Sequence, residues 1–248
     1  MRLIGRRRAA GGSPATPTAV SPLHEFHGLH YLRHNQRRQE HLASLGLPLA
    51  GRTVIEVGAG IGDHTEFFLD RGCSVLTSDG RPENVALLRQ RFPHIDVRLL
   101  DLDHPDIDFV DTADIVYCYG TLYHLAEPQL ALRFMAERCR SLLLVETCVS
   151  FGHDERINPV DEAGHHPSQA LSGRGCRPTR VWVFNRLREL FPFVYVPRTQ
   201  PWHPEFPLDW SAPTPAYYQL SRAIFVASRT ELGSPLLSGE LLATQTRH

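Results

Sequence analysis

The sequence of 248 residues contains no lysine, so all 26 of its basic residues are arginines. This absence excludes Schiff-base catalysis and a phosphate-binding loop that depends on a lysine. The sequence also has no apolar run long enough to cross a bilayer. Its formal net charge of −1 argues against a nucleic-acid or membrane partner for the chain as a whole.

Cysteine is scarce as well. The five cysteines are odd in number and widely spaced, and no two of them have the spacing of a metal site. We therefore expect reduced core residues in a cytoplasmic protein. Arg6, Arg7 and Arg8 near the N-terminus are not followed by an apolar segment, so they do not form a secretory signal.

The composition along the chain predicts one domain over residues 23–230. Residues 1–22 are rich in Arg, Gly, Ala, Ser, Thr and Pro, which is typical of a disordered basic tail. Residues 23–45 have the pattern of a helix, and residues 231–248 are expected to form a loose C-terminal tail.

The most informative stretch is 54–65, in which β-branched apolar residues precede three glycines at alternate positions, Gly58, Gly60 and Gly62. Asp63, with Glu66 three residues later, is typical of a helix start. This order predicts a buried parallel strand, a tight glycine turn and a helix, an arrangement in which backbone can approach a ligand. A dinucleotide fingerprint would carry its third glycine at position 63. The carboxylate found there would repel a pyrophosphate at a helix N-terminus.

The stretch resembles the first motif of the class I S-adenosylmethionine-dependent methyltransferases, an acidic residue followed by three alternate glycines. Glu56, Gly58, Gly60 and Gly62 match that motif position for position. The resemblance implies S-adenosylmethionine as cofactor. It also implies an α/β Rossmann-like fold: a doubly wound, mostly parallel, seven-stranded sheet with an antiparallel last strand. In the resembled family Ala59 would lie against the cofactor together with these glycines.

The second and third predicted strands supply further carboxylates. Asp79, before Gly80, ends the second strand at the distance expected in a βαβ unit, where an ionised carboxylate can accept hydrogen bonds from ribose hydroxyls. By resemblance, Asp101 would accept from the adenine amino group and the Leu102 N–H would donate to the ring. Asp103 competes with Asp101 for that role.

The fourth strand, 114–120, ends in Tyr119 and Gly120, which the resemblance places beside the cofactor. Tyr123 follows as a candidate acceptor-binding residue. His124 is the candidate general base, because a neutral imidazole can take a proton near pH 7. A histidine that only hydrogen-bonds its own loop is the alternative.

Two insertions are expected over the pocket, 148–178 and 199–220. A loop as long as 148–178 is functional or disordered, and we interpret it as a lid that shapes the acceptor site, with His153 contacting the acceptor. Its histidines and acids have irregular spacing, so we expect no metal site there. Tyr31, on the 23–45 helix, either faces the acceptor or belongs to an ordinary amphipathic helix.

These features predict a cytoplasmic S-adenosylmethionine-dependent methyltransferase, acting on an oxygen of a small molecule in secondary metabolism. Two alternatives stay open. One is an RNA-modifying enzyme similar to the wobble-uridine tRNA enzymes, which 122–124 and 146–147 resemble. The other is a non-catalytic partner protein with the cofactor fold. The sequence leaves the oligomeric state open.

Overall fold

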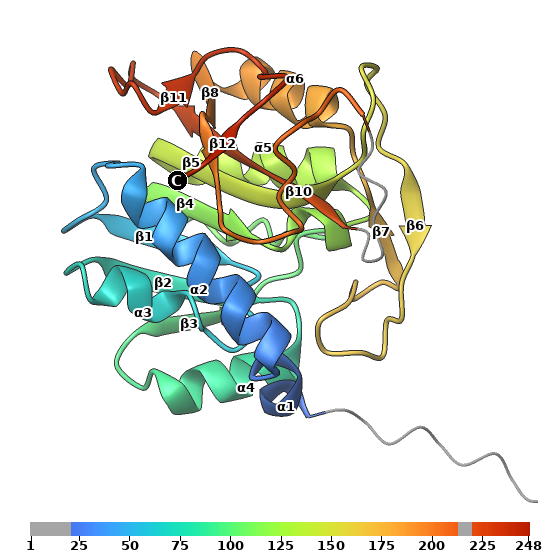
Figure 1. Cartoon of the computed structure of the whole chain (residues 1–248). Coiled ribbons are helices and arrows are strands. Elements are labelled where there is room, and N and C mark those ends of the chain that lie inside the picture. The colour runs from blue at the N-terminus through green and yellow to red at the C-terminus, as the bar shows by residue number, and fades with distance from the viewer. Residues whose placement is uncertain (1–20, 213–219) are drawn as a thin grey trace, which may run out of the picture.

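The computed structural model describes residues 21–212 and 220–248. A central eight-stranded sheet, in the order β11-β8-β10-β5-β4-β1-β2-β3, carries helices on both faces (Figure 1). Of the predicted basic tail, residues 1–20 lie outside the described residues, and Pro22 begins the first helix.

The five strands from β3 to β5 run parallel, β10 is antiparallel to both β5 and β8, and β11 is antiparallel to β8. The predicted mostly parallel, doubly wound sheet is therefore confirmed, and β11 adds an eighth strand to the seven expected. The sheet strands are β1 (Thr53–Val57), β2 (Ser74–Asp79), β3 (Asp96–Leu99), β4 (Ala113–Tyr119), β5 (Cys139–Val149), β8 (Phe193–Pro197), β10 (Ser221–Ser228) and β11 (Leu237–Ser238). Two small pairs lie outside this sheet, β6 (Pro159–Asp161) with β7 (Arg174–Cys176), and β9 (Thr199–Gln200) with β12 (Thr246–Arg247).

Two hydrophobic layers hold the helices to the sheet. On one face, α2 and α3 bury Leu42 and Phe68 against Tyr117 of β4, and on the other, α5 and α6 pack around Leu132 and Val183. The helices are α1 (Pro22–Phe26), α2 (Leu29–Ser44), α3 (Thr65–Leu69), α4 (Pro82–Arg91), the 3₁₀ turn η1 (Leu122–His124), α5 (Pro128–Arg138) and α6 (Arg180–Leu190). Within 21–212 and 220–248, every helix is too short or too polar to cross a bilayer. All five cysteines are free and buried, consistent with core positions.

The N-terminal helix differs from the single helix expected over 23–45. It is broken into α1 and α2, because the chain is extended at Gly28, which serves as the N-cap of α2. The helix after the glycines also begins later than expected, at Thr65. Asp63 does not cap it, because its carboxylate accepts from Arg91 Nη1 at 2.8 Å.

The C-terminal residues 231–248 are not a loose tail. They pair with the edge strands as β11 and β12, and Leu237 and Gln245 are buried. Gln245 Oε1 accepts a hydrogen bond from Trp210 Nε1 at 2.7 Å, and the His248 carbonyl accepts one from Trp202 Nε1 at 2.7 Å. Such side-chain contacts leave no periodic pattern in the sequence, which explains why the prediction failed here.

Candidate active site

The candidate site lies where the strand order reverses. Strands β1 and β4 are parallel neighbours, while the chain after β1 continues to β2 on the other side. Their carboxyl ends open into one pocket, as expected at such a switch point. The structure brings most of the predicted site residues to its lining, namely Tyr31, Glu56, Gly58, Ala59, Gly60, Asp79, Gly80, Asp101, Leu102, Tyr119, Gly120, Tyr123 and His124.

The glycine turn requires two of its glycines for backbone reasons. Gly58 and Gly60 have φ values of +63° and +59°, which residues with a Cβ rarely adopt. A Cβ on Gly58 would overlap the Thr121 side chain, and one on Gly60 would lie 3.0 Å from the Phe26 ring. The turn therefore fits closely between β4 and α1.

Gly62, although predicted to bind the cofactor, does not line the pocket. Its φ is +87°, and a Cβ there would overlap Phe92 and lie 2.8 Å from Leu88. The third glycine of the motif thus allows α4 to pack closely against the turn.

Asp79 organises the turns around it. Its Oδ2 accepts from the Gly60 N–H at 2.8 Å, and its Oδ1 accepts from the Arg81 N–H at 2.9 Å and from Asn84 Nδ2 at 3.1 Å. Burial raises the pKa of Asp79 to about 6, against the effect of these donors. Three donors leave roughly one of about four carboxylate lone-pair sites for a ligand hydroxyl.

Glu56 is buried at the end of β1, and its Oε2 accepts from Thr65 Oγ1 at 2.5 Å and from Thr77 Oγ1 at 3.1 Å. Burial raises its pKa to about 7, although both hydroxyls stabilise the ionised form. A positively charged ligand in this pocket would favour the carboxylate. Glu56 is therefore suited to a cationic cofactor.

The two acids after β3 have different surroundings. Asp103 is buried, and its carboxylate accepts from the Glu127 N–H at 2.9 Å and from Ser172 Oγ at 3.4 Å. Asp101 is more exposed and accepts from the Asp103 N–H at 2.9 Å. Since Asp103 is committed to the protein, Asp101 stays the better candidate for a ligand contact.

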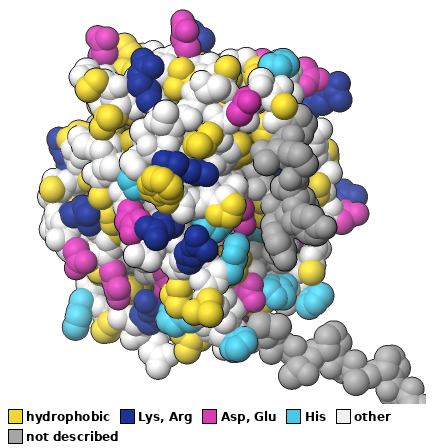
Figure 2. All heavy atoms as spheres, in the orientation of Figure 1, with side chains coloured by type: hydrophobic (Ala, Val, Ile, Leu, Met, Phe, Trp, Pro, Cys, Tyr) yellow, Lys and Arg dark blue, Asp and Glu magenta, His cyan; other side chains and the backbone are white. Residues whose placement is uncertain are grey.

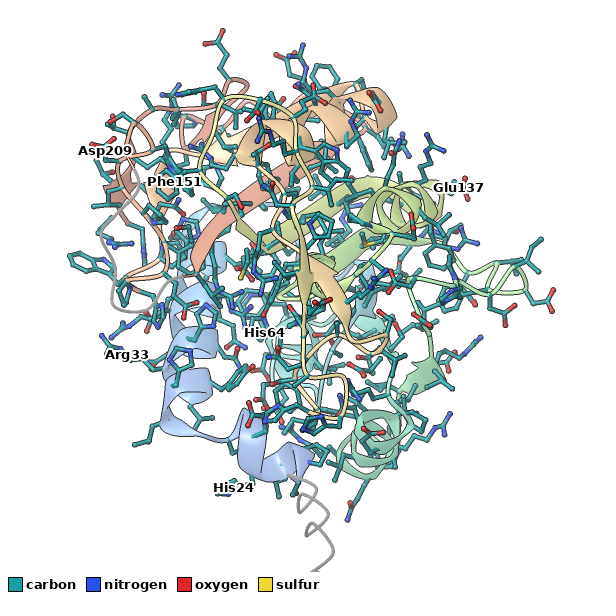
Figure 3. The ribbon with its side chains drawn as sticks, turned by 90° about the vertical axis from the view of Figure 1, so that its right-hand side faces the viewer. His24, Arg33, His64, Glu137, Phe151 and Asp209 are labelled. Atoms are coloured by element: carbon teal, nitrogen blue, oxygen red, sulfur yellow. The ribbon has the colours of Figure 1, made fainter. Side chains whose placement is uncertain are left out.

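Five buried polar atoms on pocket-lining residues have no hydrogen-bond partner within the described ranges: Asn84 Oδ1, Tyr119 Oη, His64 Nε2, His34 Nε2 and Arg38 Nε. Leaving such groups unsatisfied costs about 1–3 kcal/mol each, so they fit a polar ligand. His64 lies in the interior, with Nδ1 2.5 Å from Tyr117 Oη, whereas Arg33 lies on the outside of α2 (Figure 3). The pocket therefore meets the needs of a cofactor with ribose and amino-acid groups.

His124, on η1, is held by Glu162 of the long insertion. Its Nδ1 lies 2.5 Å from Glu162 Oε2, and Arg177 donates to Glu162 Oε1 from both Nη atoms at 3.1 Å. Burial lowers the pKa of His124 despite the neighbouring carboxylate. Burial opposes ionisation of Glu162, but the hydrogen bonds from His124 and the Ala170 N–H and the charge of Arg177 lower its pKa. Near pH 7 the pair is thus a neutral imidazole that donates through Nδ1 to a carboxylate, which leaves the Nε2 lone pair available.

The 148–178 insertion covers the pocket. Its hairpin of β6 and β7 rests directly on η1, because Gly175 has no side chain; a Cβ there would lie 2.5 Å from the Tyr123 carbonyl oxygen. Arg81 Nη2 donates to the carbonyls of Gly164 at 2.9 Å and Gln169 at 3.0 Å, and residues 167–169 and Leu171 line the pocket. His153, predicted to contact the acceptor, is exposed and does not line this pocket.

A buried network of charges, which sequence reasoning missed, forms another wall. Glu146 is fully buried, and its carboxylate accepts from Arg38 Nη1 at 2.8 Å and from Arg222 Nη1 at 3.1 Å. These two arginines hold the pKa of Glu146 below its usual value against burial. Arg222 also donates to Tyr123 Oη at 3.2 Å, and Gly120 leaves room for Arg38. No local motif marks Arg38 or Arg222, because their partners are distant in the sequence.

Comparisons with known proteins agree with this geometry. Residues 54–143 match the family described as "Methyltransferase domain". The tRNA U34 carboxymethyltransferase of Shewanella putrefaciens is 30% identical over 162 residues, which cover 60% of this chain and 47% of the relative. The enzyme of the same name from Shewanella denitrificans is 31% identical over 137 residues, or 52% of this chain and 40% of the relative. The chain therefore spans about half the length of the curated relatives that it matches.

Solved structures share the fold. The N-terminal domain of EvdMO1, crystallised in the presence of SAH and D-fucose, superposes with a TM-score of 0.60 at 21% identity, covering 81% of this chain and 84% of that one. The 1,6-didemethyltoxoflavin-N1-methyltransferase of Burkholderia thailandensis, with its substrate and S-adenosylhomocysteine bound, gives 0.54 at 19% identity, covering 90% and 94%. Residues 54–143 therefore match a methyltransferase domain, and the chain has the Rossmann-like fold of S-adenosylmethionine-dependent methyltransferases.

Proposed function

We propose that this chain transfers a methyl group from S-adenosylmethionine to a hydroxyl oxygen of a small molecule, as in biosynthesis of secondary metabolites. The observation that carries this proposal is the pairing of His124 with Glu162 beside the cofactor pocket. A hydroxyl acceptor must lose a proton as it is methylated, and a neutral imidazole backed by a carboxylate suits that task.

S-adenosylmethionine supplies a methyl group already activated by a sulfonium. With the cofactor bound, His124 Nε2 would accept the hydroxyl proton as the new O–CH₃ bond forms and the S–CH₃ bond breaks. Glu162 fixes the imidazole tautomer and stabilises the imidazolium that results. The lid residues 167–171 exclude water from the reacting groups, and Tyr31 and Tyr123 are the aromatic side chains proposed to hold the acceptor.

Replacement of His124 tests the proposal. Methyl transfer is assayed with S-adenosylmethionine and a panel of small molecules that carry hydroxyl or amino groups, and we expect His124→Asn to lower kcat by about 10²–10⁴-fold. Cofactor binding, measured by calorimetry, should be retained. The exposed His153→Asn variant is the matched control and should keep its rate. A His124→Asn enzyme with an unchanged kcat would refute the role of His124, and turnover restricted to nitrogen acceptors would refute O-methylation.

A second candidate is modification of tRNA, as in the relatives named above. The observation that favours it is Arg222, a buried pocket-lining cation that donates to Tyr123. A donor of a carboxymethyl group carries a carboxylate that such a cation could bind. Against it, basic and acidic side chains are interspersed on the face in Figure 2, and the net charge is −1. Measuring tRNA affinity across salt concentrations separates the two candidates, because phosphate contacts give a steep salt dependence.

A further inference from the structure

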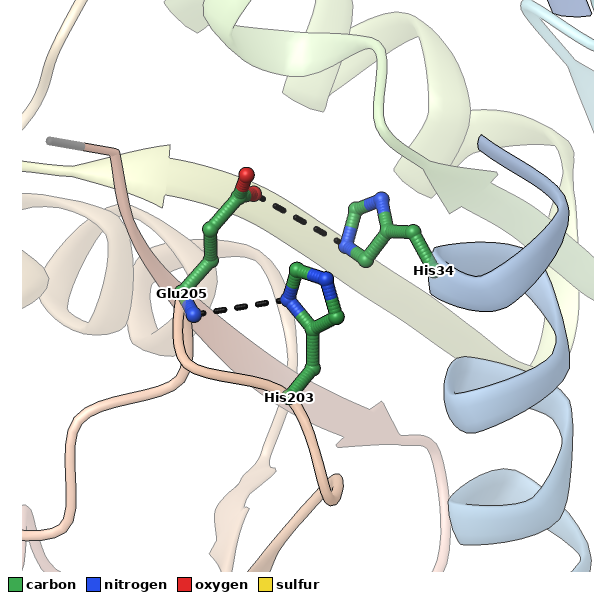
Figure 4. Close-up of side chains that lie close together, drawn as sticks. All are labelled: His34, His203 and Glu205. Atoms are coloured by element: carbon green, nitrogen blue, oxygen red, sulfur yellow. Dashed lines mark hydrogen bonds and ion pairs between the residues drawn. The ribbon is translucent and has the colours of Figure 1, made fainter. Parts of the chain in front are cut away.

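A cluster of imidazoles and a carboxylate lies beside the proposed acceptor side of the pocket, outside the groups used so far. His34 comes from α2, while His203 and Glu205 come from the segment after β9, and their side chains point toward one another (Figure 4). The side chains of all three residues are buried, with relative exposures of 1%, 4% and 7%. Each offers one ligand atom, and these atoms lie within 4.8 Å of one another.

His30 extends the cluster to four possible ligands. It precedes His34 by one helical turn on α2, the i, i+4 spacing that places two histidines on the same face. Its Nε2 lies 3.4 Å from Glu205 Oε1, and its ring centre lies 5.7 Å from that of His203. Three imidazoles and a carboxylate from two distant segments converge here.

The hydrogen bonds of the cluster leave ligand atoms free. His34 Nε2 is buried, has no hydrogen-bond partner within the described ranges, and lies 3.9 Å from Glu205 Oε2. Arg222 Nε donates to Glu205 Oε2 at 2.5 Å, so Oε1, which lies on the side of His30, is the oxygen that can bind an ion. His203 Nδ1 accepts from the Glu205 N–H at 3.4 Å, a contact long enough to be exchanged at little cost.

The charges around the cluster permit a cation. Arg38 and Arg222 are nearby, but both pair with Glu146, and Glu205, which also pairs with Arg222, would be shared with the ion. Burial lowers the pKa of His34 well below its usual value and that of His203 to about 4, so both rings are neutral at pH 7. Neutral imidazoles are the form that binds metals.

We propose that His30, His34, His203 and Glu205 bind a divalent transition-metal ion of the zinc class. Imidazole nitrogens and a carboxylate oxygen are ligands that Zn²⁺ accepts, with bonds of about 2.0–2.2 Å. Bonds of that length place ligand atoms roughly 3.5 Å apart, so the side chains close by about 1 Å around the ion. The ion ties α2 to the 203–205 segment and so holds the pocket wall that contains His34 and Arg222. The proposal does not depend on the acceptor or on methyl transfer.

The test is metal binding to the purified full chain after chelation. We expect close to one Zn²⁺ per chain by elemental analysis, and the visible absorption of four-coordinate Co²⁺ on replacement. Zn²⁺ should also raise the Tm. Loss of a residue that only hydrogen-bonds a metal ligand typically weakens metal binding by roughly 10–100-fold. His203→Asn removes a ligand itself, so it should weaken Zn²⁺ binding by more than that and should abolish the rise in Tm.

Two further variants keep the test decisive. The His30 side chain is 62% exposed, so His30→Ala is expected to fold normally and still to weaken binding. His104, whose side chain is 81% exposed and distant in sequence from the cluster, supplies the control His104→Asn, which should bind as the wild type does. Absence of stoichiometric Zn²⁺ or Co²⁺ binding would overturn the proposal, as would equal affinities in the His30, His203 and His104 variants.

Discussion

The two sides of the pocket are built in different ways. The cofactor side consists of the turns that follow β1, β2 and β3, and its hydrogen bonds join residues of successive turns, as between the Gly60 N–H and Asp79, 19 positions apart. The proposed acceptor side combines α2, η1 and the start of β10, and the 148–178 insertion covers both sides. Contacts on the acceptor side join residues as far apart as Arg38 and Glu146, separated by 108 positions.

This difference predicts that substitutions on the two sides have different consequences. Close backbone approach and positive φ angles restrict the residues on the cofactor side, so substitutions there should act on binding of the donor. The acceptor side depends on buried charges that satisfy one another, so substitutions there should act first on stability. The following changes test that division, beginning with the largest expected effect.

Gly58→Val should abolish cofactor binding. The new side chain would overlap Thr121, and a β-branched residue is strained at a φ of +63°. We expect calorimetry to find affinity for S-adenosylhomocysteine lowered by at least about 100-fold, equivalent to about 2.7 kcal/mol. Gly72→Val is the matched control, because its φ is +69° but nothing lies within 4 Å of its Cβ position. Equal losses of affinity in the two variants would mean that backbone strain, and not contact at the turn, governs binding.

Glu146→Gln should destabilise the fold by about 3–5 kcal/mol, because it leaves Arg38 and Arg222 buried without their shared carboxylate. Denaturant unfolding measures the change. Glu137, whose side chain is 72% exposed and paired with Arg138 (Figure 3), supplies the control Glu137→Gln, with an expected effect of about 0–1 kcal/mol. Similar midpoints for the two variants would show that the buried network contributes little to stability.

The same division explains what could be predicted from the sequence. The cofactor side could be predicted from the sequence because each signal is local. These signals are a strand ending in Glu56, glycines at fixed spacing, and Asp79 at the end of the next strand. The family match and the sheet topology agree with the predicted fold, and the roles of these residues in binding the cofactor stay a prediction. Even there, Gly62 matched the motif but serves the packing of α4, since a motif does not reveal on which side of the turn a Cβ would lie.

The proposed acceptor side could not be predicted from local sequence signals. Nothing near Arg222 in the sequence indicates that Glu146 and Glu205 lie beside it, because sheet pairing and loop packing bring them together. His124 was recognised as a candidate, but its partner Glu162 lies in an insertion without periodicity. The 231–248 segment was misjudged for the same reason, since side-chain contacts with 200–210 order it.

The pH dependence of cofactor binding should identify Glu56 as the charge that the donor meets. The pKa of Glu56 in the folded protein is about 7, above its ordinary value of 4.5. Between pH 4.5 and 7 the folded protein therefore keeps Glu56 protonated while the unfolded chain does not. The contribution of Glu56 to stability falls as pH rises across this range. A cationic ligand needs the carboxylate, so affinity for S-adenosylmethionine should increase as pH rises toward about 7 and level off above it. The increase is about tenfold for each unit by which binding lowers the pKa.

Calorimetry in buffers of different ionisation enthalpy would detect the released proton. Glu56→Gln should remove both the release and the pH dependence near 7, while the lower pKa of Asp79, about 6, leaves any remaining dependence at more acidic pH. A wild-type affinity that is flat across this range would contradict a contact between the cation and Glu56.

The smallest expected effect concerns the contact between the lid and α1. Ser168 Oγ donates to Glu25 Oε1 at 2.9 Å, and Phe26 of the same helix faces Gly60, so this bond joins the two elements that cover the cofactor turn. Ser168→Ala removes this bond, worth about 0.5–1.5 kcal/mol, together with the contact between Ser168 Oγ and His166 Nδ1 at 3.1 Å, and should weaken cofactor binding by about 2–10-fold with kcat unchanged. The exposed Ser211→Ala should have no effect. A fall in kcat with intact affinity would assign the lid to chemistry, whereas a loss of both with a lowered Tm would mean that α1 depends on this bond to fold.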